Sequence, residues 1–340
     1  MDPTDASNRF ERKPWLAWLI VAAIVLVAAE LVLRFTGLDI VKFAYDFRQV
    51  YRYHDRWYTD YEPATSTHIR LPADQGYVLN FLVTVNQHGF RSADLPAEHF
   101  DQSRANIKYI HAIGDSFTMG WGVNYESSYP ALLDTLVSPE YAVLNLGLNG
   151  FGAIGATEKS LEVAQRFPPA YAIYLATAND YDDDHAALEY AQRPWLVHRF
   201  MDSINFLRRT TYLATIPFAA RWWIYYRDAQ VASGQPEDAD KASLTLLPVS
   251  GHSNDAIGNP SKRAITAYAK ALADRNVPFL VVGHGDSEVV TDILRFCKEQ
   301  DIPTLHVMVP AALNLAGGDG HFNAYGNRRI AELIYRRIRS

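Results

Sequence analysis

The sequence contains one cysteine in 340 residues, Cys297. This excludes an intramolecular disulfide and any zinc site built from several cysteines. The sequence also lacks an excess of positive charge, because 32 basic residues face 38 acidic ones. Nucleic-acid binding needs clustered Lys and Arg, so we expect no nucleic-acid partner. What the sequence does contain is 49% apolar residues, enough for a folded chain with one large domain or two small ones.

One apolar run, residues 15–33, carries a single charge, at Glu30. As a helix this run is about 28 Å long, close to the thickness of the hydrocarbon core of a bilayer. Trp15 and Trp18 suit one membrane interface, and Glu30 is spaced to pair with Arg34 near the other. We predict an uncleaved transmembrane signal anchor. The alternatives are a buried helix and a cleaved signal peptide, although the run is long for a signal peptide and has no clear A-x-A site.

Basic residues set the expected orientation of this anchor. Arg9, Arg12 and Lys13 crowd its N-terminal flank, whereas the basic residues after it are spread out. The denser cluster favours a cytoplasmic tail over residues 1–14 and places the rest of the chain outside. We therefore expect a single-pass protein of a cell inner membrane, with its main domain periplasmic or extracellular.

Residues 34–106 are expected to form an arm that leads into the main domain. Eight aromatic residues fall between positions 43 and 61. Such a cluster either packs against a domain or forms an aromatic belt at a membrane interface. The sequence leaves both interpretations open.

From residue 107 onward, short apolar strands alternate with segments of helical spacing. The predicted strands are 107–113, 141–147, 171–177, 278–283 and 303–309, and the predicted helices are 130–137, 154–166, 287–300 and 323–339. This alternation predicts an α/β domain over residues 107–340, with a parallel sheet covered by helices on both faces. Ligands bind such sheets at the carboxyl ends of the strands.

A stretch of about 185–277 interrupts this alternation. It begins with helical, aromatic sequence and continues over 228–262 with Ser, Gly, Pro, Asp and Asn, so we predict an insertion of helices followed by a loop. A second membrane span over 210–226 is disfavoured, because the segment is short and contains Pro217 and Arg221. The insertion is our candidate for a lid or for a wall that binds an acyl acceptor.

Residues with catalytic chemistry follow four of the predicted strands. Ser116 follows the first, Gly150 the second, Asn179 the third, and Asp319 with His321 the fifth. A serine on a tight turn exposes its hydroxyl, a glycine N–H and an Asn amide can bind an oxyanion, and a histidine can take a proton near neutral pH. Taken singly, each of these turns has an ordinary structural explanation.

Their shared position favours a common function. The carboxyl ends of parallel strands lie along one edge of a sheet, so nucleophile, oxyanion donors and base are expected to meet there. Asp319 and His321 are two residues apart, so in an extended segment the carboxylate can orient the imidazole. This set meets the requirements of acyl transfer through an acyl-serine. We interpret the acidic run at 182–184 as a solvated loop, and we expect no metal and no cofactor.

The set resembles the SGNH (GDSL) hydrolase superfamily over about residues 86–335. Its blocks correspond to Ile113-Gly114-Asp115-Ser116, Gly150, Asn179-Asp180, and Asp319 with His321. The resemblance implies a three-layer α/β/α, flavodoxin-like fold, with Ser116 as nucleophile, His321 as general base and Asp319 orienting it. It implies an oxyanion hole made of the Ser116 and Gly150 N–H groups and the Asn179 side chain. The segment 86–91, Asn-Gln-His-Gly-Phe-Arg, resembles a bacterial membrane-anchored subgroup.

Two positions depart from the superfamily pattern. Thr177 stands where the third block usually has glycine, and the fifth block reads Asp-x-His instead of Asp-x-x-His. The shorter spacing is similar to that in the SGNH domains of polysaccharide O-acetyltransferases. The superfamily resemblance implies an esterase or carbohydrate O-deacetylase acting on an acyl ester or an acetylated glycan, whereas the shorter spacing favours a transferase over a plain esterase. The alternatives are an O-acetyltransferase for a cell-surface polysaccharide, with a membrane protein as acyl donor, and a non-catalytic glycan-binding or assembly module.

Overall fold

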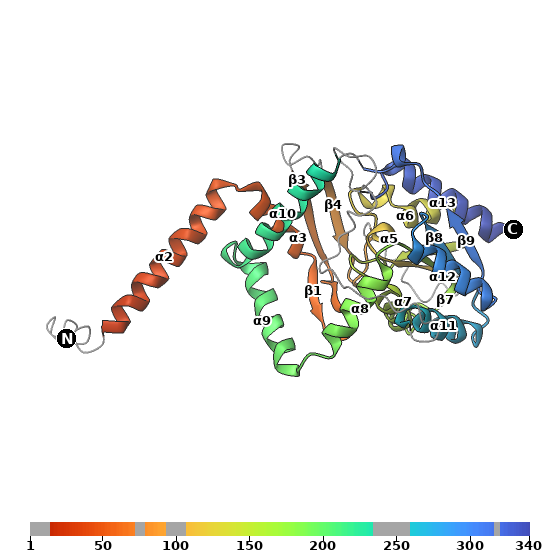
Figure 1. The fold of residues 1–340 in the computed structure, drawn as a ribbon, viewed down its shortest axis with the longest axis horizontal. Helices are drawn as coiled ribbons and strands as arrows, with labels where there is room; N and C mark the ends of the chain where they lie inside the picture. Colours follow the sequence, from red (N-terminus) through yellow and green to blue (C-terminus); the bar gives the residue numbers. More distant parts are fainter. Residues whose placement is uncertain (1–13, 72–78, 93–106, 234–258, 316–319) are drawn as a thin grey trace.

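The structure is a computed structural model that describes residues 14–71, 79–92, 107–233, 259–315 and 320–340. Its centre is a parallel sheet (Figure 1), whose five strands lie in the order β6-β5-β7-β8-β9. The strands are β5 (Lys108–Gly114), β6 (Tyr141–Asn145), β7 (Pro169–Ala176), β8 (Phe279–His284) and β9 (Thr304–Val307). All five correspond to predicted strands, so the predicted parallel α/β sheet is confirmed.

Apolar side chains alternate between the two faces of this sheet. Ile173 and Leu175 of β7 lie in one hydrophobic cluster, together with α6 (Tyr129–Val137) and α13 (Ala324–Arg339). Tyr174 and Ala176 lie in the other cluster, together with α7 (Ala153–Val163), α11 (Pro260–Ala273) and α12 (Glu288–Glu299). A parallel strand is buried on both faces, so both sets of side chains are apolar. The result is the predicted three-layer α/β/α arrangement.

Two of the covering helices begin at the residues that the sequence indicated. The Ser287 hydroxyl accepts the Val290 N–H at the start of α12. The Asn323 side chain accepts the N–H groups of Tyr325 and Gly326 at 2.9 and 3.1 Å at the start of α13. Such caps satisfy N–H groups that have no acceptor within the helix. Because α13 follows His321 so closely, its cap also fixes the end of the loop that carries this histidine.

After the predicted anchor, the predicted arm contains one helix and two hairpins, and the hairpins were not predicted. The predicted anchor lies in α2 (Pro14–Thr36), and the arm contains α3 (Asp39–Arg48), β1 (Tyr51–His54) paired with β2 (Tyr58–Tyr61), and β3 (Thr65–Leu71) paired with β4 (Leu79–Val85). Phe43, Tyr51 and Trp57 are buried in the same hydrophobic core as Ile113 and Leu144 of the sheet. The aromatic cluster of this segment therefore packs against the domain.

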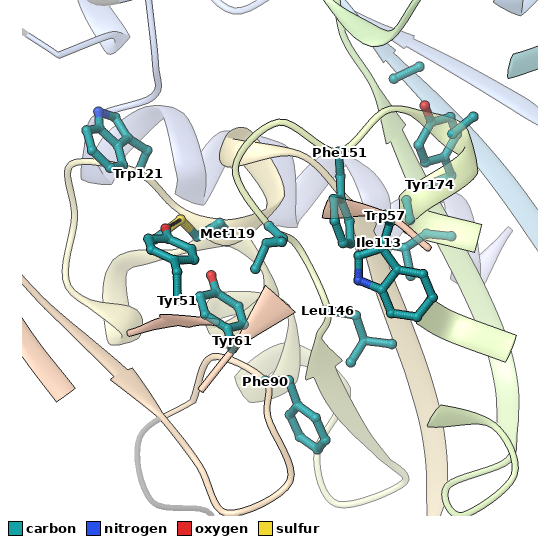
Figure 2. Close-up of a cluster of buried hydrophobic side chains, with 14 of the residues drawn as sticks. Tyr51, Trp57, Tyr61, Phe90, Ile113, Met119, Trp121, Leu146, Phe151 and Tyr174 are labelled. Carbon is teal, nitrogen blue, oxygen red and sulfur yellow. Dashed lines mark hydrogen bonds between the residues drawn. The ribbon is translucent and has the colours of Figure 1, made fainter. Parts of the chain in front are cut away.

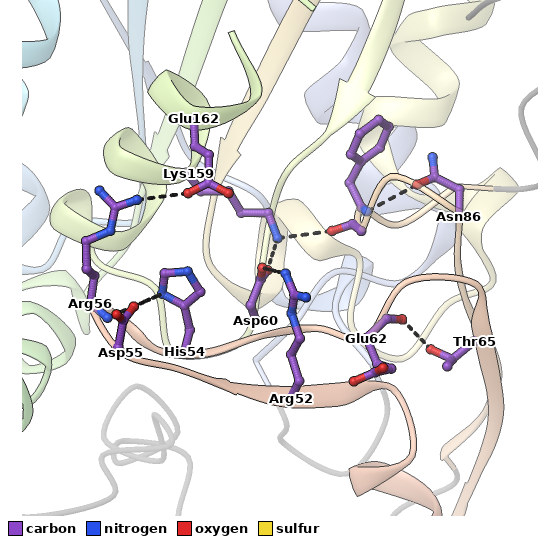
Figure 3. Close-up of polar contacts among 12 residues, drawn as sticks. Arg52, His54, Asp55, Arg56, Asp60, Glu62, Thr65, Asn86, Lys159 and Glu162 are labelled. Atoms are coloured by element: carbon purple, nitrogen blue, oxygen red, sulfur yellow. Dashed lines mark hydrogen bonds and ion pairs between the residues drawn. The ribbon is translucent and has the colours of Figure 1, made fainter. Parts of the chain in front are cut away.

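A buried ion pair joins the first hairpin to α7. The Lys159 ammonium donates to the carboxylate of Asp60 and, at 3.2 Å, to the Gly89 carbonyl, and Arg52 Nη2 lies 3.0 Å from Asp60 (Figure 3). Lys159 and Asp60 are 3% and 5% exposed. Burial acts to raise the pKa of Asp60, but the Lys159 and Arg52 cations bring it below its ordinary value. Removal of Asp60 would leave the buried Lys159 ammonium without a counter-charge, so this pair helps to hold the hairpin to the sheet domain.

The helix α2 lies outside this core. None of its apolar stretch is buried, and among the described residues it is the one helix long and apolar enough to cross a membrane. The predicted pair is present, with Arg34 Nε 2.8 Å from Glu30 Oε1. A helix of this length and composition suits a membrane anchor and a signal sequence alike.

The insertion contains α8 (Asp180–Ala191), α9 (Trp195–Thr210), the short 3-10 turn η3 (Leu213–Thr215) and α10 (Ile216–Ser233). The predicted loop over 228–262 begins later in the structure, because α10 continues to Ser233, and residues 234–258 lie outside the described part. The predicted insertion range of 185–277 also includes α11, but this helix covers the sheet. Trp222 of α10 packs edge-on against Phe43 and Phe47 of α3, with ring centroids 5.2 and 5.5 Å apart. The insertion therefore packs on the N-terminal segment.

Candidate active site

Ser116 is the first residue of a short helix, α5 (Ser116–Met119), directly after β5. The turn between them is made by Gly114, at φ +148°, and by Asp115, whose carboxylate accepts the Phe117 N–H at 2.9 Å. Glycine tolerates this backbone conformation, and the carboxylate caps the helix. The N–H of a first helical residue has no acceptor within its helix. Ser116 thus carries both its hydroxyl and a backbone donor at the edge of the sheet.

The imidazole of His321 lies against this hydroxyl. Ser116 Oγ and His321 Nε2 are 2.7 Å apart, although the two residues are 205 positions apart in the sequence. Both side chains are half-buried. This distance is a hydrogen bond and is suited to proton transfer from a nucleophile to a general base. The predicted orienting residue, Asp319, lies outside the described residues.

Aromatic rings surround the imidazole. The Phe117 and Trp121 rings lie 4.5 and 6.2 Å from the His321 ring, measured between centroids. Trp121 in turn stacks at 6.5 Å on Trp222 of α10. The insertion therefore contacts the site indirectly, because Trp222 packs on Trp121 and Trp121 packs near the His321 ring.

The two other predicted oxyanion donors follow β6 and β7. Gly150 is exposed at φ +75°, and among the described residues its N–H has no acceptor. The turn that contains it packs on the nucleophile turn, where the Leu148 N–H donates to the Gly114 carbonyl at 3.1 Å. Asn179 precedes α8, and its Nδ2 donates to Asp183 at 2.5 Å. Asn179 also forms a side-chain hydrogen bond that acts to lower the pKa of Asp115, so its amide lies against the residue that precedes the nucleophile.

The hydroxyl of Thr177, for which the sequence predicted no role, is buried next to the site. Thr177 Oγ1 is 2.8 Å from Asp115 Oδ2, 2.9 Å from Asn179 Oδ1 and 3.1 Å from Asp180 Oδ1. Thr177 is 2% exposed, so its side chain points into the protein. It connects the residue before the nucleophile to the predicted oxyanion donor. The sequence contains one sign of the capping role of Asp115. An Asp directly before the first residue of a helix is a typical N-cap, and Asp115 directly precedes Ser116.

The carboxyl groups around Thr177 are poorly solvated. Burial raises the pKa of Asp115, and burial together with the nearby Asp115 raises that of Asp180 well above its ordinary value. The Tyr174 hydroxyl donates to Asp180 at 2.5 Å. The Thr177 hydroxyl has one proton and three neighbouring oxygens, so it donates to one of them at a time.

The N-terminal segment supports the nucleophile turn from behind. Tyr51 lies with its hydroxyl 3.8 Å from Met119 Sδ, and the Tyr61 hydroxyl donates to the Gly147 carbonyl at 3.2 Å (Figure 2). Arg91, from the predicted 86–91 motif, is fully buried. Its guanidinium donates to the carbonyls of Met119, Gly120, Val123 and Leu82 at 2.6, 2.7, 2.6 and 3.1 Å. Five N–H donors in a fixed plane suit several carbonyls at once.

The interpretation of residues 182–184 as a solvated loop is wrong. These residues belong to α8, and Asp184 is 1% exposed. Its carboxylate accepts the N–H groups of Ala153 and Ile154 at 3.0 and 2.8 Å, which are orphan donors at the start of α7. Within the described residues, no group of three or more His, Cys, Asp or Glu side chains is placed to hold a metal ion.

No protein-family model matches the chain, and no curated protein matches it. Similar solved structures include a G-D-S-L family protein from Desulfitobacterium hafniense, with 16% identity, 67% of this chain and 98% of that chain covered, and a TM-score of 0.39. They also include the esterase EstA from Pseudoalteromonas sp. (10% identity, 68% and 97% covered, TM-score 0.39) and the aryl esterase of M. smegmatis (14%, 68% and 98%, TM-score 0.34). Similarity at this level carries no argument about activity.

Proposed function

We propose that this chain is a serine ester hydrolase of the SGNH type, in which Ser116 is the nucleophile and His321 the general base. The observation that carries the proposal is the 2.7 Å hydrogen bond between Ser116 Oγ and His321 Nε2. A neutral imidazole accepts at one ring nitrogen and carries its proton on the other. The role we assign to Asp319, as acceptor of the second ring N–H, stays a prediction.

The reaction divides into two acyl transfers. In the first, Ser116 Oγ forms a bond to the ester carbonyl carbon while its proton moves to His321 Nε2, and the imidazolium then protonates the departing alcohol. In the second, His321 takes a proton from water, the hydroxide adds to the acyl-serine, and the acid leaves as Ser116 regains its proton. The half-buried position of both side chains allows an ester to reach them.

The oxyanion of each tetrahedral intermediate needs fixed donors. We assign this role to the N–H groups of Ser116 and Gly150 and to the Asn179 amide. Loss of one such donor typically raises the barrier by about 3–4 kcal/mol. Asp183 and Thr177 hold the amide by its Nδ2 and Oδ1 atoms. They therefore act as positioning residues for Asn179.

The test uses the full chain in detergent micelles with p-nitrophenyl acetate as substrate. We expect turnover in the native chain and none above background in Ser116→Ala and His321→Ala. Ser66→Ala, an exposed serine on β3, is the matched control and should retain full turnover. A fluorophosphonate probe should label the native chain and not Ser116→Ala. Equal turnover in the native chain and Ser116→Ala, or absence of both turnover and labelling, would contradict the proposal, and the second outcome would favour a non-catalytic module.

The acyl acceptor distinguishes an esterase or deacetylase from an O-acetyltransferase. The same Ser116, His321 and oxyanion donors serve both reactions, because only the second acceptor changes from water to a glycan hydroxyl. Addition of polysaccharide fragments during turnover, followed by mass spectrometry, separates the two. Acetylated sugar that depends on Ser116 would favour the transferase, and release of acetate alone would favour the hydrolase.

We also propose that α2 is an uncleaved anchor and that the domain lies outside the cytoplasm. Support comes from the unburied apolar surface of α2 and from the basic cluster before it. A reporter enzyme that works only outside the cytoplasm, fused after Ser340, should be active. The mass of the mature chain should include residues 1–36. A mature chain that begins after α2 would show a cleaved signal peptide instead.

A further inference from the structure

The helix α9 exposes an apolar face to its surroundings. Its large exposed side chains are Trp195 (72%), Leu196 (65%), Phe200 (63%), Phe206 (67%) and Leu207 (49%). At 3.6 residues per turn these five positions fall within an arc of about 140°. An exposed apolar stripe on one helix is unusual for a surface in water and marks a contact with an apolar partner.

The opposite face of α9 is packed inward and is mixed, with the apolar Val197, Met201 and Ile204 beside polar residues. Arg208 is 8% exposed, with its guanidinium carbon 3.4 Å from the Phe218 ring centroid. His198 contacts the Tyr53 hydroxyl of β1 and, at 2.9 Å, the Arg193 carbonyl. An ordinary surface helix turns its apolar side inward, whereas α9 carries its largest apolar side chains on its outer face. The outer face of α9 is therefore suited to an environment other than water.

The C-terminal end of α9 is attached to the apolar helix α2. The Tyr212 and Leu213 N–H groups, just after α9, each donate to Glu30 at 3.0 Å. Arg34 Nη2 donates to the Thr210 carbonyl at 2.9 Å, and its guanidinium carbon lies 5.2 Å from the Tyr212 ring centroid. Glu30 lies inside the apolar run and Arg34 directly after it. The junction thus lies where the apolar run of α2 ends.

Figure 1 shows α9 at the side of the domain nearest to α2, with both helices extending from this junction. We propose that the exposed face of α9 binds the phospholipid bilayer, in the interface through which α2 enters it. This inference rests on the proposed anchor. A helix of this kind lies with its apolar side about 5–10 Å into the boundary between headgroups and acyl chains, where Trp and Phe are favoured. Arg199 lies within the same arc, and a long basic side chain can extend from there to the headgroups.

The contact would orient the active site. The insertion is linked to His321 through Trp222 and Trp121, and α9 precedes α10 within it. A bilayer held by α2 and α9 together would fix the domain at two points, so that Ser116 stays at a constant height above the membrane.

The test uses single cysteines in the full chain, labelled with the fluorophore NBD, in vesicles of phosphatidylethanolamine and phosphatidylglycerol. Phe200→Cys and Phe206→Cys report on α9, Val25→Cys on α2, and Glu299→Cys, exposed on α12, is the matched control. Cys297 is retained in every variant, and it is buried, so we expect the label to react with the added cysteine. The native chain treated with the label measures any reaction at Cys297. Both α9 positions are exposed, so their substitution removes no core contact. Lipids that carry a nitroxide near the headgroup, for the α9 labels, or deep in the acyl chain, for the Val25 label, and iodide in the water serve as quenchers.

We expect the nitroxide lipid to quench the two α9 labels several-fold more than the Glu299 label, and iodide to quench them less. The proposal would be overturned if iodide quenched the α9 labels as strongly as it quenches the Glu299 label. If the nitroxide lipid still quenched the Val25 label in that experiment, the anchor would stand. Quenching of the α9 labels by neither agent would also overturn the proposal and would indicate a protein partner. A Val25 label that lipid does not quench would overturn the anchor, and this inference with it.

Discussion

Thr177 Oγ1 lies 2.8 Å from Asp115 Oδ2, so a side chain at the end of β7 binds the residue that precedes the nucleophile at the end of β5. The two strands are neighbours in the sheet. The superfamily pattern has glycine at position 177, where no such bond can form. In this chain a hydroxyl performs the connection between the nucleophile turn and Asn179.

Thr177→Val should therefore disturb both stability and turnover. Valine has the same shape but no hydroxyl, so it removes the one buried hydrogen-bonding group that lies between the oxygens of Asp115 and Asn179. We expect a loss of about 1–3 kcal/mol in the free energy of unfolding and a fall in kcat on the order of tenfold or more, because Asn179 loses its positioning contact. Thr177→Ser keeps the hydroxyl and is the control. Urea unfolding and ester turnover measure the two effects, and equal values for the Val and Ser variants would refute this role.

Arg91→Met should destabilise the fold more strongly. The guanidinium donates to four backbone carbonyls around the C-terminal end of α5, and Met fills a similar volume without donors. Buried carbonyls left unsatisfied cost on the order of 3 kcal/mol or more in total. Arg91→Lys should recover only part of this loss, since an ammonium cannot reproduce the planar fork. Thermal and urea unfolding give the comparison, and full rescue by Lys would show that charge alone is needed.

Two glycines near the site form a matched pair. A Cβ on Gly147 would collide with the backbone of Thr118 and Met119 in the nucleophile helix, whereas a Cβ on Gly150 would meet nothing within 4 Å. Gly147→Ala should therefore displace α5 and abolish turnover. Gly150→Ala should cost only about 1–2 kcal/mol, from its positive φ, and should keep its N–H in place. Ester turnover at matched folded fractions tests the pair, and the reverse order of activities would contradict the packing described for Gly147.

The buried His111 predicts a pH dependence of stability. Its Nδ1 lies 2.7 Å from Ser160 Oγ and its Nε2 donates to the Phe167 carbonyl at 2.8 Å, which suits the neutral ring. Burial lowers the pKa of His111 from 6.5 to about 4. Between these two pH values the unfolded chain binds more protons than the folded one, so stability is full above about pH 6.5 and falls as the pH drops towards 4.

The size of the pKa shift limits the contribution of His111 to the free energy of unfolding to about 3 kcal/mol. His111→Gln should be less stable at pH 7 and should lose this part of the pH slope. Urea unfolding at several pH values between 4 and 7 measures both. An identical slope in the native chain and the variant would show that other groups, such as the buried carboxyls, dominate acid unfolding.

The sequence predicted the sheet well because its strands are continuous apolar runs between turns, which is typical of strands buried on both faces. The two hairpins were not predicted. Their strands are as short as four residues, as in Tyr51–His54, and their polar and aromatic pattern depends on pairing partners. Packing of this kind is settled by tertiary contacts and not by local preference.

The positions of Ser116, Gly150, Asn179 and His321 could be predicted because parallel topology brings strand ends to one edge. The contacts of Thr177 and Arg91 could not. Their partners lie 62 and 28 residues away, at Asp115 and Met119, and no local pattern relates the members of each pair. The roles of the predicted site residues, and that of Asp319 above all, stay predictions until the variants are measured.

The hydrophobic core that α3 and the first hairpin share with the sheet has a consequence for making a soluble form of this protein. A fragment that began at residue 60 would lack Phe43, Tyr51 and Trp57, and with Tyr51 the side chain that abuts Met119. It would expose the rear of the nucleophile turn to water. A soluble version that keeps this core has to start near Gly37, in the turn between the apolar helix and α3. A protease that released the domain intact would have to cut at the same turn.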